Sequence, residues 1–453
     1  MEKKIITILS IYILMAGMQS SNAQENQIFP SMNNICGTDK AMKEFYRSNP
    51  QAKEEQQARE IFIQQYIESH PNTGNPERTT STVAKYRIPV VMHVYGGPTH
   101  TFWGKTVTKA IIDGAIAELN LDFQGLCADY NNENQAFTSV KSKIDVSFEL
   151  ALKKADGTVT DGVDWKTTTG AGYGGTGMDA QIAADAWDNK MYFNIYIVAD
   201  LYNDGVNNNS GVCWYPSVSM TNGKTARMVY NGQYLGTNST NTEFRGEFTH
   251  EAGHFFNLAH TFDGNSCTGV GDNVSDTPQL SNNNLGGHPA PVKTTTLPQD
   301  CGHLIMTEDF MDYNGCFVGQ NMFTIGQVAR MTAALNLNDV TRFPLWQTSN
   351  LIKTGLLNAT GIETNNSEMI VSNIYPNPSS GKFQIELNIK KQDTYLLEVI
   401  NVFGQIIYQK SLGTISGNYE TQIDIATEAK GIYFLAITGY QTRKIVKLIK
   451  SEE

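Results

Sequence analysis

Residues 250–260 read HEAGHFFNLAH and contain three of the chain's eight histidines. His250 and His254 are four residues apart, so in a helix both imidazoles project from the same face and can reach one ion. Glu251 follows the first histidine, close enough to act on a water at that ion without being a ligand. The stretch therefore predicts a metal site built on a helix.

A sharp turn must follow this helix if His260 is to complete the site from outside it. Asn257 stands where the turn is required, and asparagine readily accepts the left-handed conformation. Three histidines leave one position of a tetrahedral zinc ion open, which is typical of catalytic sites. We expect His250, His254 and His260 to bind one Zn²⁺, with Glu251 as general base and acid in metal-assisted hydrolysis. A structural zinc site is the alternative, but such sites favour cysteine, and the motif contains none.

Composition and length limit the other possibilities. The chain has 453 residues, so two or more folded units are expected. The net charge of -11 argues against nonspecific nucleic-acid binding, which needs clustered lysine and arginine. The acidic excess suits solubility or the binding of cations.

The first residues carry the features of a secretory signal. Lys3 and Lys4 precede an apolar run over residues 5–18, and small residues end at Ala23. We predict a signal peptide over residues 1–23. The alternative, a retained membrane anchor, would need an apolar run of ~20 residues. No other segment is apolar enough to be a transmembrane segment.

Composition and pattern divide the remainder into a polar segment (24–78), a catalytic domain with the histidine motif (79–350), a linker (351–372) and a C-terminal domain (373–453). In the polar segment, which the resemblance given below implies is a propeptide, we expect a solvated helix over residues 50–69. In the catalytic domain, strands over 87–97, 143–152, 190–201 and 211–218 and a helix over 106–123 predict an α/β (α+β) fold with a mixed sheet and the active-site helix. Alternating apolar residues from Phe383 onward predict a small all-β sandwich at the C-terminus.

The histidine motif resembles the zinc site of the metzincin peptidases, with Asn257 in place of the family glycine. Further stretches resemble the pappalysin family of metzincins: HTF (260–262), GDNVSDTP (271–278), DFMDY (309–313) and FTIGQVARM (323–331). The resemblance implies a methionine turn with Met311 beneath the zinc, and a substrate that runs antiparallel to an upper-rim strand, here GVCWYPSV (211–218). It also implies that Tyr313 stabilises the oxyanion of the tetrahedral intermediate. An ordinary core tyrosine is the alternative for Tyr313.

The same resemblance assigns several residues outside the motif. Asp272, Asp276 and Thr277 match a calcium-binding loop and offer the oxygen ligands that Ca²⁺ prefers; a solvated acidic loop is the alternative. ICGTD (35–39) is similar to the family's cysteine switch, in which the Cys36 thiolate binds the zinc until the propeptide is removed within residues 71–87. A structural disulfide is the alternative for Cys36.

The resemblance also bears on the cysteines and on specificity. Cys267 and Cys301 match a family disulfide, whereas the partners of Cys127, Cys213 and Cys316 stay open. The family's acidic residue shortly after the catalytic tyrosine helps to select a basic side chain past the cut bond. That residue is absent after Tyr313, so this preference is not carried over.

The C-terminal domain resembles the sorting domain of type IX secretion substrates, through YPNPSSG (375–381), NVFGQ (401–405) and GIYFL (431–435). A fibronectin-like adhesive module is the alternative. The sequence therefore predicts a monomeric zinc endopeptidase, made as a latent zymogen and acting on protein or peptide substrates. The secretion machinery would export it across the outer membrane, to be released or attached to the cell surface. A catalytically inactive surface adhesin on a peptidase fold is the second hypothesis, and zinc hydrolysis of a non-peptide amide or ester is a third.

Overall fold

The computed structural model describes residues 36–75, 84–206, 210–238, 246–281, 299–313, 320–357, 369–401, 406–438 and 443–451. The predicted signal peptide and Cys316 lie outside the described residues. Among the helices that are described, none has the length and apolar character needed to cross a membrane.

A six-stranded mixed sheet forms the centre of the first folded unit, in the order β5-β1-β7-β9-β8 with β6 also on β1. Strand β1 (Tyr86–Tyr95) runs parallel to β5 (Val146–Leu150), β6 (Val163–Lys166) and β7 (Phe193–Val198). Strand β9 (Met228–Asn231) is parallel to β7, whereas the edge strand β8 (Gly211–Cys213) is antiparallel to β9. The predicted mixed α/β fold is confirmed.

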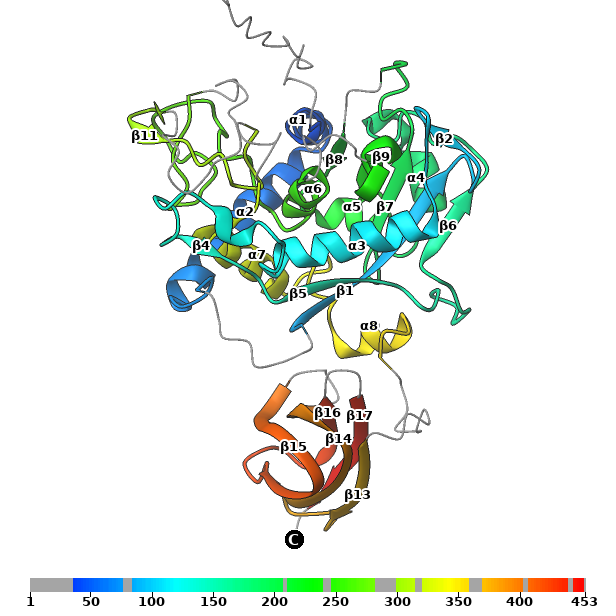
Figure 1. Ribbon diagram of the computed structural model, residues 1–453, viewed down its shortest axis with the longest axis vertical. Helices are drawn as coiled ribbons and strands as arrows, with labels where there is room; N and C mark the ends of the chain where they lie inside the picture. Colours follow the sequence, from blue (N-terminus) through cyan, green and yellow to red (C-terminus); the bar gives the residue numbers. More distant parts are fainter. Residues whose placement is uncertain are drawn as a thin grey trace, which may run out of the picture. The chain divides into compact units, whose positions relative to one another are not determined.

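Burial explains the continuous apolar run in β1. Val90 and Met92 on one face and Val91 and Tyr95 on the other are all fully buried, because helices and loops cover both faces of a mainly parallel sheet. Helix α3 (Lys109–Phe123) lies along one face, as Figure 1 shows, and Thr108 caps it by accepting from the Ile111 backbone N–H. Helix α6 (Glu247–Phe255) packs against both α3 and β8, so the sheet and α3 together fix the active-site helix.

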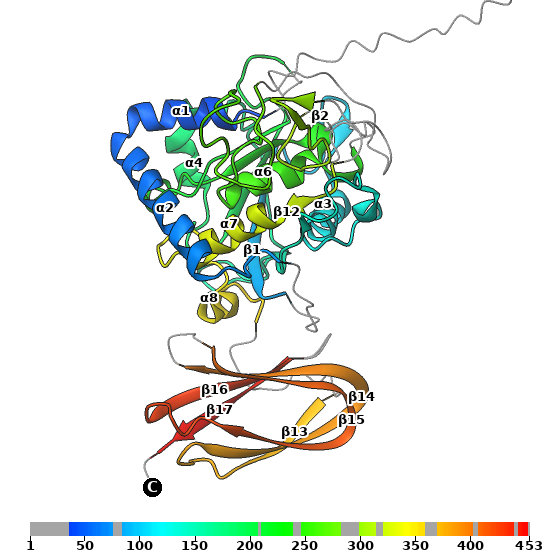
Figure 2. The ribbon, with the colours of Figure 1, turned by 90° about the vertical axis from the view of Figure 1, so that its left-hand side faces the viewer.

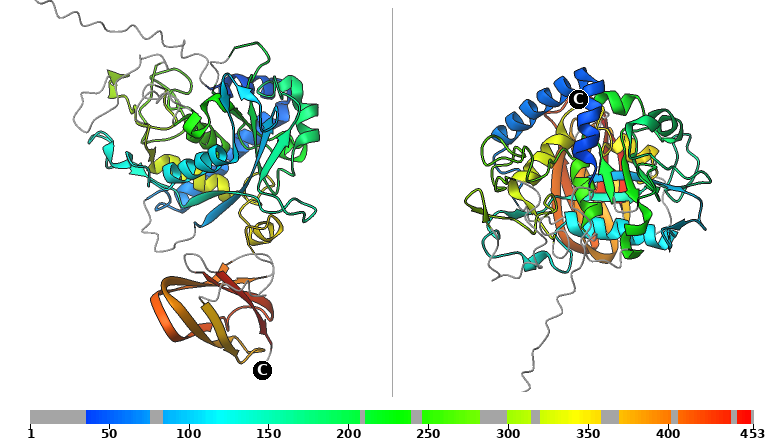
Figure 3. Two further views of the ribbon diagram at one scale, coloured as in Figure 1. Left: turned by 45° about the vertical axis from the view of Figure 1, so that its right-hand side comes forward. Right: turned by 90° about the horizontal axis from the view of Figure 1, so that it is seen from above.

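Two of the described helices precede the sheet in the chain: α1 (Thr38–Ser48) and α2 (Pro50–Ser69), which meet at an angle on one side of the unit (Figures 2 and 3). The extent of α2 agrees with the sequence analysis, since Pro50 occupies its first turn. The expectation that it would be solvated holds for most of its residues but not for one face. Arg59 and Ile63 are buried, because α2 packs on helix α7 (Ile325–Asn336).

Shorter elements complete this unit. Thr324 caps α7 in a reciprocal capping box with Gln327. Further elements are the helices α4 (Asp179–Asp185), α5 (Val218–Asn222) and α8 (Thr348–Lys353), and the strand pairs β2 (Thr101–Phe102) with β3 (Lys105–Thr106), β4 (Lys141–Ser142) with β12 (Phe323–Thr324), and β10 (Gln299–Asp300) with β11 (His303–Leu304).

The C-terminal unit is an antiparallel sheet of five strands: β13 (Met369–Tyr375), β14 (Lys382–Asn401), β15 (Ile406–Asp424), β16 (Gly431–Thr438) and β17 (Arg443–Lys450). Strand β14 is irregular between Ile389 and Asp393, so its first half pairs with β13 and its second half with β16. Phe383 and Ile385 from one half share a core with Leu397 and Val399 from the other. The predicted all-β unit is confirmed as one bent sheet that encloses its own core.

Candidate active site

Helix α6 ends in a way that brings three histidines together. Asn257 has φ +70°, and the backbone N–H groups of Asn257 and Leu258 donate to the carbonyls of His254 (2.9 Å) and Gly253 (3.1 Å). This is the Schellman termination, with asparagine where glycine is usual. The left-handed residue turns the chain back, so that His260 faces the two histidines on the helix.

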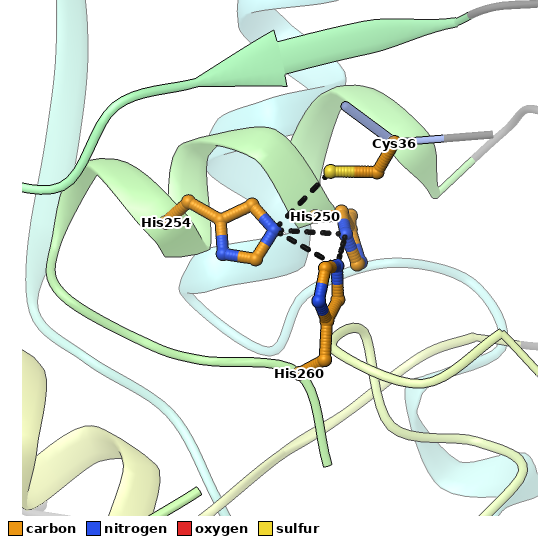
Figure 4. A group of neighbouring side chains, drawn as sticks. All are labelled: Cys36, His250, His254 and His260. Atoms are coloured by element: carbon orange, nitrogen blue, oxygen red, sulfur yellow. Dashed lines mark hydrogen bonds between the residues drawn. The ribbon is translucent and has the colours of Figure 1, made fainter. Parts of the chain in front are cut away.

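The three imidazoles point their Nε2 atoms at one another (Figure 4). The separation is 3.1 Å for His250 and His254, and 3.2 Å from each of these to His260. Nitrogens placed ~2.0–2.1 Å from a tetrahedral zinc ion would be about 3.3–3.4 Å apart. The triangle therefore fits a zinc-sized cation.

Backbone and side-chain acceptors fix the orientation of each ring. The Nδ1 atoms of His250 and His254 lie 2.6 Å and 2.7 Å from the carbonyl oxygens of Phe310 and Leu258, and His260 Nδ1 lies 3.0 Å from Asp39 Oδ2. With Nδ1 as the donor, the lone pair of each Nε2 faces the common centre. Burial and the neighbouring rings also lower the pKa of His250 and His254 well below the ordinary value, so both imidazoles are neutral.

Cys36 supplies a fourth donor to the same centre. Its Sγ lies 3.4 Å from His254 Nε2, and with the three histidines it forms a group whose ligand atoms all lie within 4.8 Å of one another. Figure 4 shows the sulfur above the triangle of nitrogens. Cysteine and histidine together are donors that zinc prefers.

The segment around Cys36 is held on the edge strand β8. Gly37 N donates to Gly211 O at 3.0 Å, and Cys36 forms an isolated parallel bridge with Gly211. The Thr38 hydroxyl donates to Cys213 O and accepts from Cys213 N, both at 3.0 Å. A Cβ on Gly37 would overlap the Tyr202 hydroxyl, so only glycine fits beside the cysteine.

Glu251 lies under β8, on the same side as the segment around Cys36. It is fully buried, and its Oε2 lies 3.4 Å from the Thr38 hydroxyl. A Cβ on Gly211 would come within 2.7 Å of Oε1, so the glycine makes room for the carboxylate. Burial first, and the nearby Glu247 second, raise the pKa of Glu251 well above its usual value.

Met311 and Tyr313 approach the site from the segment that follows β11. A Cβ on Gly253 would overlap the sulfur of Met311, so the methionine packs directly beneath the helix that carries His250 and His254. The Tyr313 hydroxyl lies 3.0 Å from His260 Nε2. Both residues therefore lie next to the histidine triangle.

The acidic loop has protein partners for its side chains. The Thr277 hydroxyl lies 2.9 Å from both oxygens of Asp272. Asp276 accepts from the Thr324 hydroxyl at 2.7 Å and from Gly326 N at 2.9 Å, so it joins the loop to the start of α7. Burial raises the pKa of Asp272 to about 7.

The predicted disulfide between Cys267 and Cys301 is confirmed. Cys127 and Cys213 are both buried. Burial also raises the pKa of the Cys213 thiol well above its usual value.

Comparisons with known proteins agree with this geometry. Residues 176–336 match the family described as pregnancy-associated plasma protein-A, and residues 373–451 match the secretion system C-terminal sorting domain. Extracellular metalloproteases of Sordaria macrospora and Neurospora crassa are each 29% identical to this chain, over 266 and 263 residues. Each alignment covers 56% of this chain, and the two cover 77% and 76% of the respective relative. The solved structure of a Tannerella forsythia promirolysin mutant has a TM-score of 0.56 and 25% identity, and covers 72% of this chain and 100% of that one.

Fold, site and relatives together define a secreted metallopeptidase. Residues 176–336 form a pappalysin-like metallopeptidase region, and residues 373–451 match the C-terminal sorting domain of type IX secretion substrates.

Three residues near the site were not anticipated from the sequence. Asp39 contacts His260, Gly253 gives Met311 its space, and Glu247 is buried one turn before Glu251, where Ser210 Oγ donates to it at 3.1 Å. The i, i+4 spacing of Glu247 and Glu251 was visible in the sequence and indicates a shared helix face. The other two contacts join segments that are far apart in the chain.

Replacing Gly253 with alanine should destabilise the site, because the new methyl group would displace Met311. We expect Gly253→Ala to lower the free energy of unfolding by about 1–3 kcal/mol, the usual cost of overpacking. The double variant Gly253→Ala/Met311→Ala should lose less free energy of unfolding than the two single variants lose together. Denaturant unfolding of all four proteins measures this, and additive losses would contradict the contact.

Proposed function

We propose that this metallopeptidase is a zinc endopeptidase, made as a zymogen in which Cys36 occupies the catalytic position. The observation that carries the proposal is the convergence of three imidazole Nε2 atoms and one thiol on a centre next to a buried glutamate. His250, His254 and His260 would hold the ion. Residues 24–78 would be the propeptide and residues 79–350 the catalytic domain.

The residues around this centre have distinct roles in peptide hydrolysis. A bound zinc ion would supply Lewis acidity, which activates water and polarises the carbonyl of the scissile bond. Glu251 would take the proton of the attacking water and deliver it to the leaving amine. Tyr313 would donate its hydroxyl proton in a hydrogen bond to the developing oxyanion.

The geometry of the edge strand β8 favours an extended peptide as the substrate. Its pairing with β9 leaves its outer edge to the segment around Cys36, which hydrogen-bonds to Gly211 and Cys213. A substrate strand would add to this edge through backbone hydrogen bonds, and such bonds do not depend on the substrate's side chains. We propose that a substrate runs antiparallel to β8, opposite in direction to the parallel bridge at Cys36. The reversed direction would protect the propeptide from cleavage where it crosses the site.

Loss of the general base should abolish cleavage. We expect the Glu251→Ala enzyme, freed of its propeptide and loaded with zinc, to lose about 10²–10⁴-fold in rate on a proteome-derived peptide library. Glu420→Ala, an exposed position in the C-terminal unit, is the matched control and should cleave like the wild type. Mass spectrometry of the products also identifies the preferred residues around the cut bond. A wild type that carries zinc and cuts nothing would leave the inactive adhesin as the better hypothesis.

Loss of the thiol should weaken latency. We expect the intact Cys36→Ser proenzyme to hydrolyse peptides faster than the intact wild-type proenzyme, because serine is a poor zinc ligand and leaves the fourth position open to water. The test compares initial rates of intact wild-type and variant proenzymes, with chain integrity followed by gel electrophoresis. Equal, negligible rates for both would show that the sulfur does not hold the enzyme latent.

We further propose that Asp272, Asp276 and Thr277 form a calcium-dependent loop. The buried Asp272 has a pKa of about 7, whereas an ordinary aspartate has a pKa of 3.8. Between these two pH values the folded state keeps the proton of Asp272 and the unfolded state has lost it. Asp272 therefore costs no stability at pH values below about 4, and the full cost is present once the pH exceeds about 7. A calcium ion beside the carboxylate would remove that cost.

In chelator at pH 8, Asp272→Asn should therefore melt at a higher temperature than the wild type, with a smaller difference at pH 5. Added calcium should raise the melting temperature of the wild type but not of Asp272→Asn. The exposed Asp156→Asn is the control and should respond to calcium like the wild type. A calcium response that is equal or absent in the wild type and Asp272→Asn would exclude an ion at this loop.

A further inference from the structure

Helix α2 lies far along the chain from the metal-binding histidines, yet it contacts the turn between them. It packs beside α7, as Figure 2 shows. Gln56 Nε2 donates to Asn257 Oδ1 at 3.0 Å, and Asn257 Nδ2 donates to Glu60 Oε1 at 2.9 Å. Both polar atoms of the Asn257 side chain are thus used by α2.

A partly buried ion pair joins Glu60, and through it the Asn257 turn, to α7. Arg330 Nη2 lies 2.8 Å from Glu60 Oε2, and the side chains are 5% and 27% exposed. Arg330 Nη2 also lies 3.5 Å from Asn257 O, so one guanidinium contacts both the helix and the turn. Glu60 therefore receives hydrogen bonds from Arg330 and Asn257 together.

A second ion pair lies next to the first on the helix. Arg59 Nη2 is 3.0 Å from Asp339 Oδ2, and Arg59 Nη1 is 3.4 Å from the Thr341 hydroxyl. Its side chain is 3% exposed, and the nearby Ile63 is fully buried. Two neighbouring residues of α2 thus carry opposite charges, and each faces a residue of the opposite sign: Arg59 faces Asp339, and Glu60 faces Arg330.

We propose that Asn257, Arg330 and Asp339 form a binding surface for α2 that holds the propeptide independently of Cys36. The proposal rests on the proposed latency and adds that a cut within residues 76–83 leaves the propeptide bound. None of the contacts at this surface involves the thiol or its neighbours Gly37 and Thr38. Release of α2 then becomes a step of activation separate from cleavage.

The surface explains what Asn257 does beyond accepting a positive φ. Glycine would form the same turn, because it reaches the left-handed region without strain. It would lack the amide that donates to Glu60 and accepts from Gln56. Asparagine at this position therefore connects the fold of the metal site to recognition of the propeptide.

The test uses the full chain with Glu251→Ala, so that self-digestion does not intervene, and with a recognition sequence for a specific protease inserted after Thr79. After the cut, size-exclusion chromatography and native mass spectrometry measure how fast the propeptide dissociates from the zinc-loaded remainder. We expect Glu60→Ala to dissociate about tenfold faster than the wild type, because the partly buried Arg330 and the Asn257 amide would both lose their partner. Glu54→Ala, exposed on the same helix, is the matched control and should dissociate at the wild-type rate.

Two further variants distinguish binding through this surface from binding through the thiol and from misfolding of the propeptide. The Cys36→Ser chain should retain its propeptide after the cut, and release within the mixing time would overturn the proposal. The exchanged pair Glu60→Arg/Arg330→Glu should dissociate more slowly than Glu60→Arg alone, which a misfolded propeptide would not do. A rate for Glu60→Ala equal to that of the wild type would also overturn it. Because every chain here lacks the general base, the outcome is independent of whether the wild type cleaves peptides.

Discussion

The active site depends on the direction in which three imidazole rings face. Each Nδ1 has an acceptor, the carbonyls of Phe310 and Leu258 and the carboxylate of Asp39, and these hydrogen bonds turn the Nε2 atoms toward one centre. Three ring nitrogens 3.1–3.2 Å apart, with their lone pairs facing inward, repel one another unless a cation lies between them. The surrounding fold has to hold this arrangement, and α3, the sheet and Met311 support α6 from different sides.

One of the three acceptors belongs to the proposed propeptide. Asp39 contacts His260 from the segment that also brings Cys36 to the centre, so this segment supplies both a fourth donor and the partner of a ligand. Although burial opposes ionisation of Asp39, His260 holds its pKa at about 2, so the carboxylate stays charged. Removal of the propeptide would therefore change the surroundings of His260 as well as opening the fourth position. Helix α2 contacts the Asn257 turn, which lies between the second and third histidines.

Much of the site follows from local rules that a sequence displays. The four-residue spacing places His250 and His254 on one face of a helix, and the need for a turn explains why Asn257 adopts a positive φ. The apolar runs at β1 and β7 and the alternation in β14 likewise predict buried strands. The strand expected over residues 211–218 is shorter, because β8 ends at Cys213 and the chain continues into α5. Contacts between distant segments could not be read in this way: Arg59 looks like part of a solvated charged helix until Asp339 is placed beside it.

The central claim is that three histidine nitrogens and the sulfur of Cys36 bind one zinc ion in the proenzyme. X-ray absorption at the zinc edge of the purified proenzyme tests it directly, because zinc–sulfur and zinc–nitrogen distances differ, ~2.3 Å against ~2.0–2.1 Å. The account predicts one sulfur and three nitrogen neighbours in the proenzyme, and loss of the sulfur once the propeptide has been removed. A zinc ion without a sulfur neighbour in the intact proenzyme, or a proenzyme that binds no zinc, would contradict it.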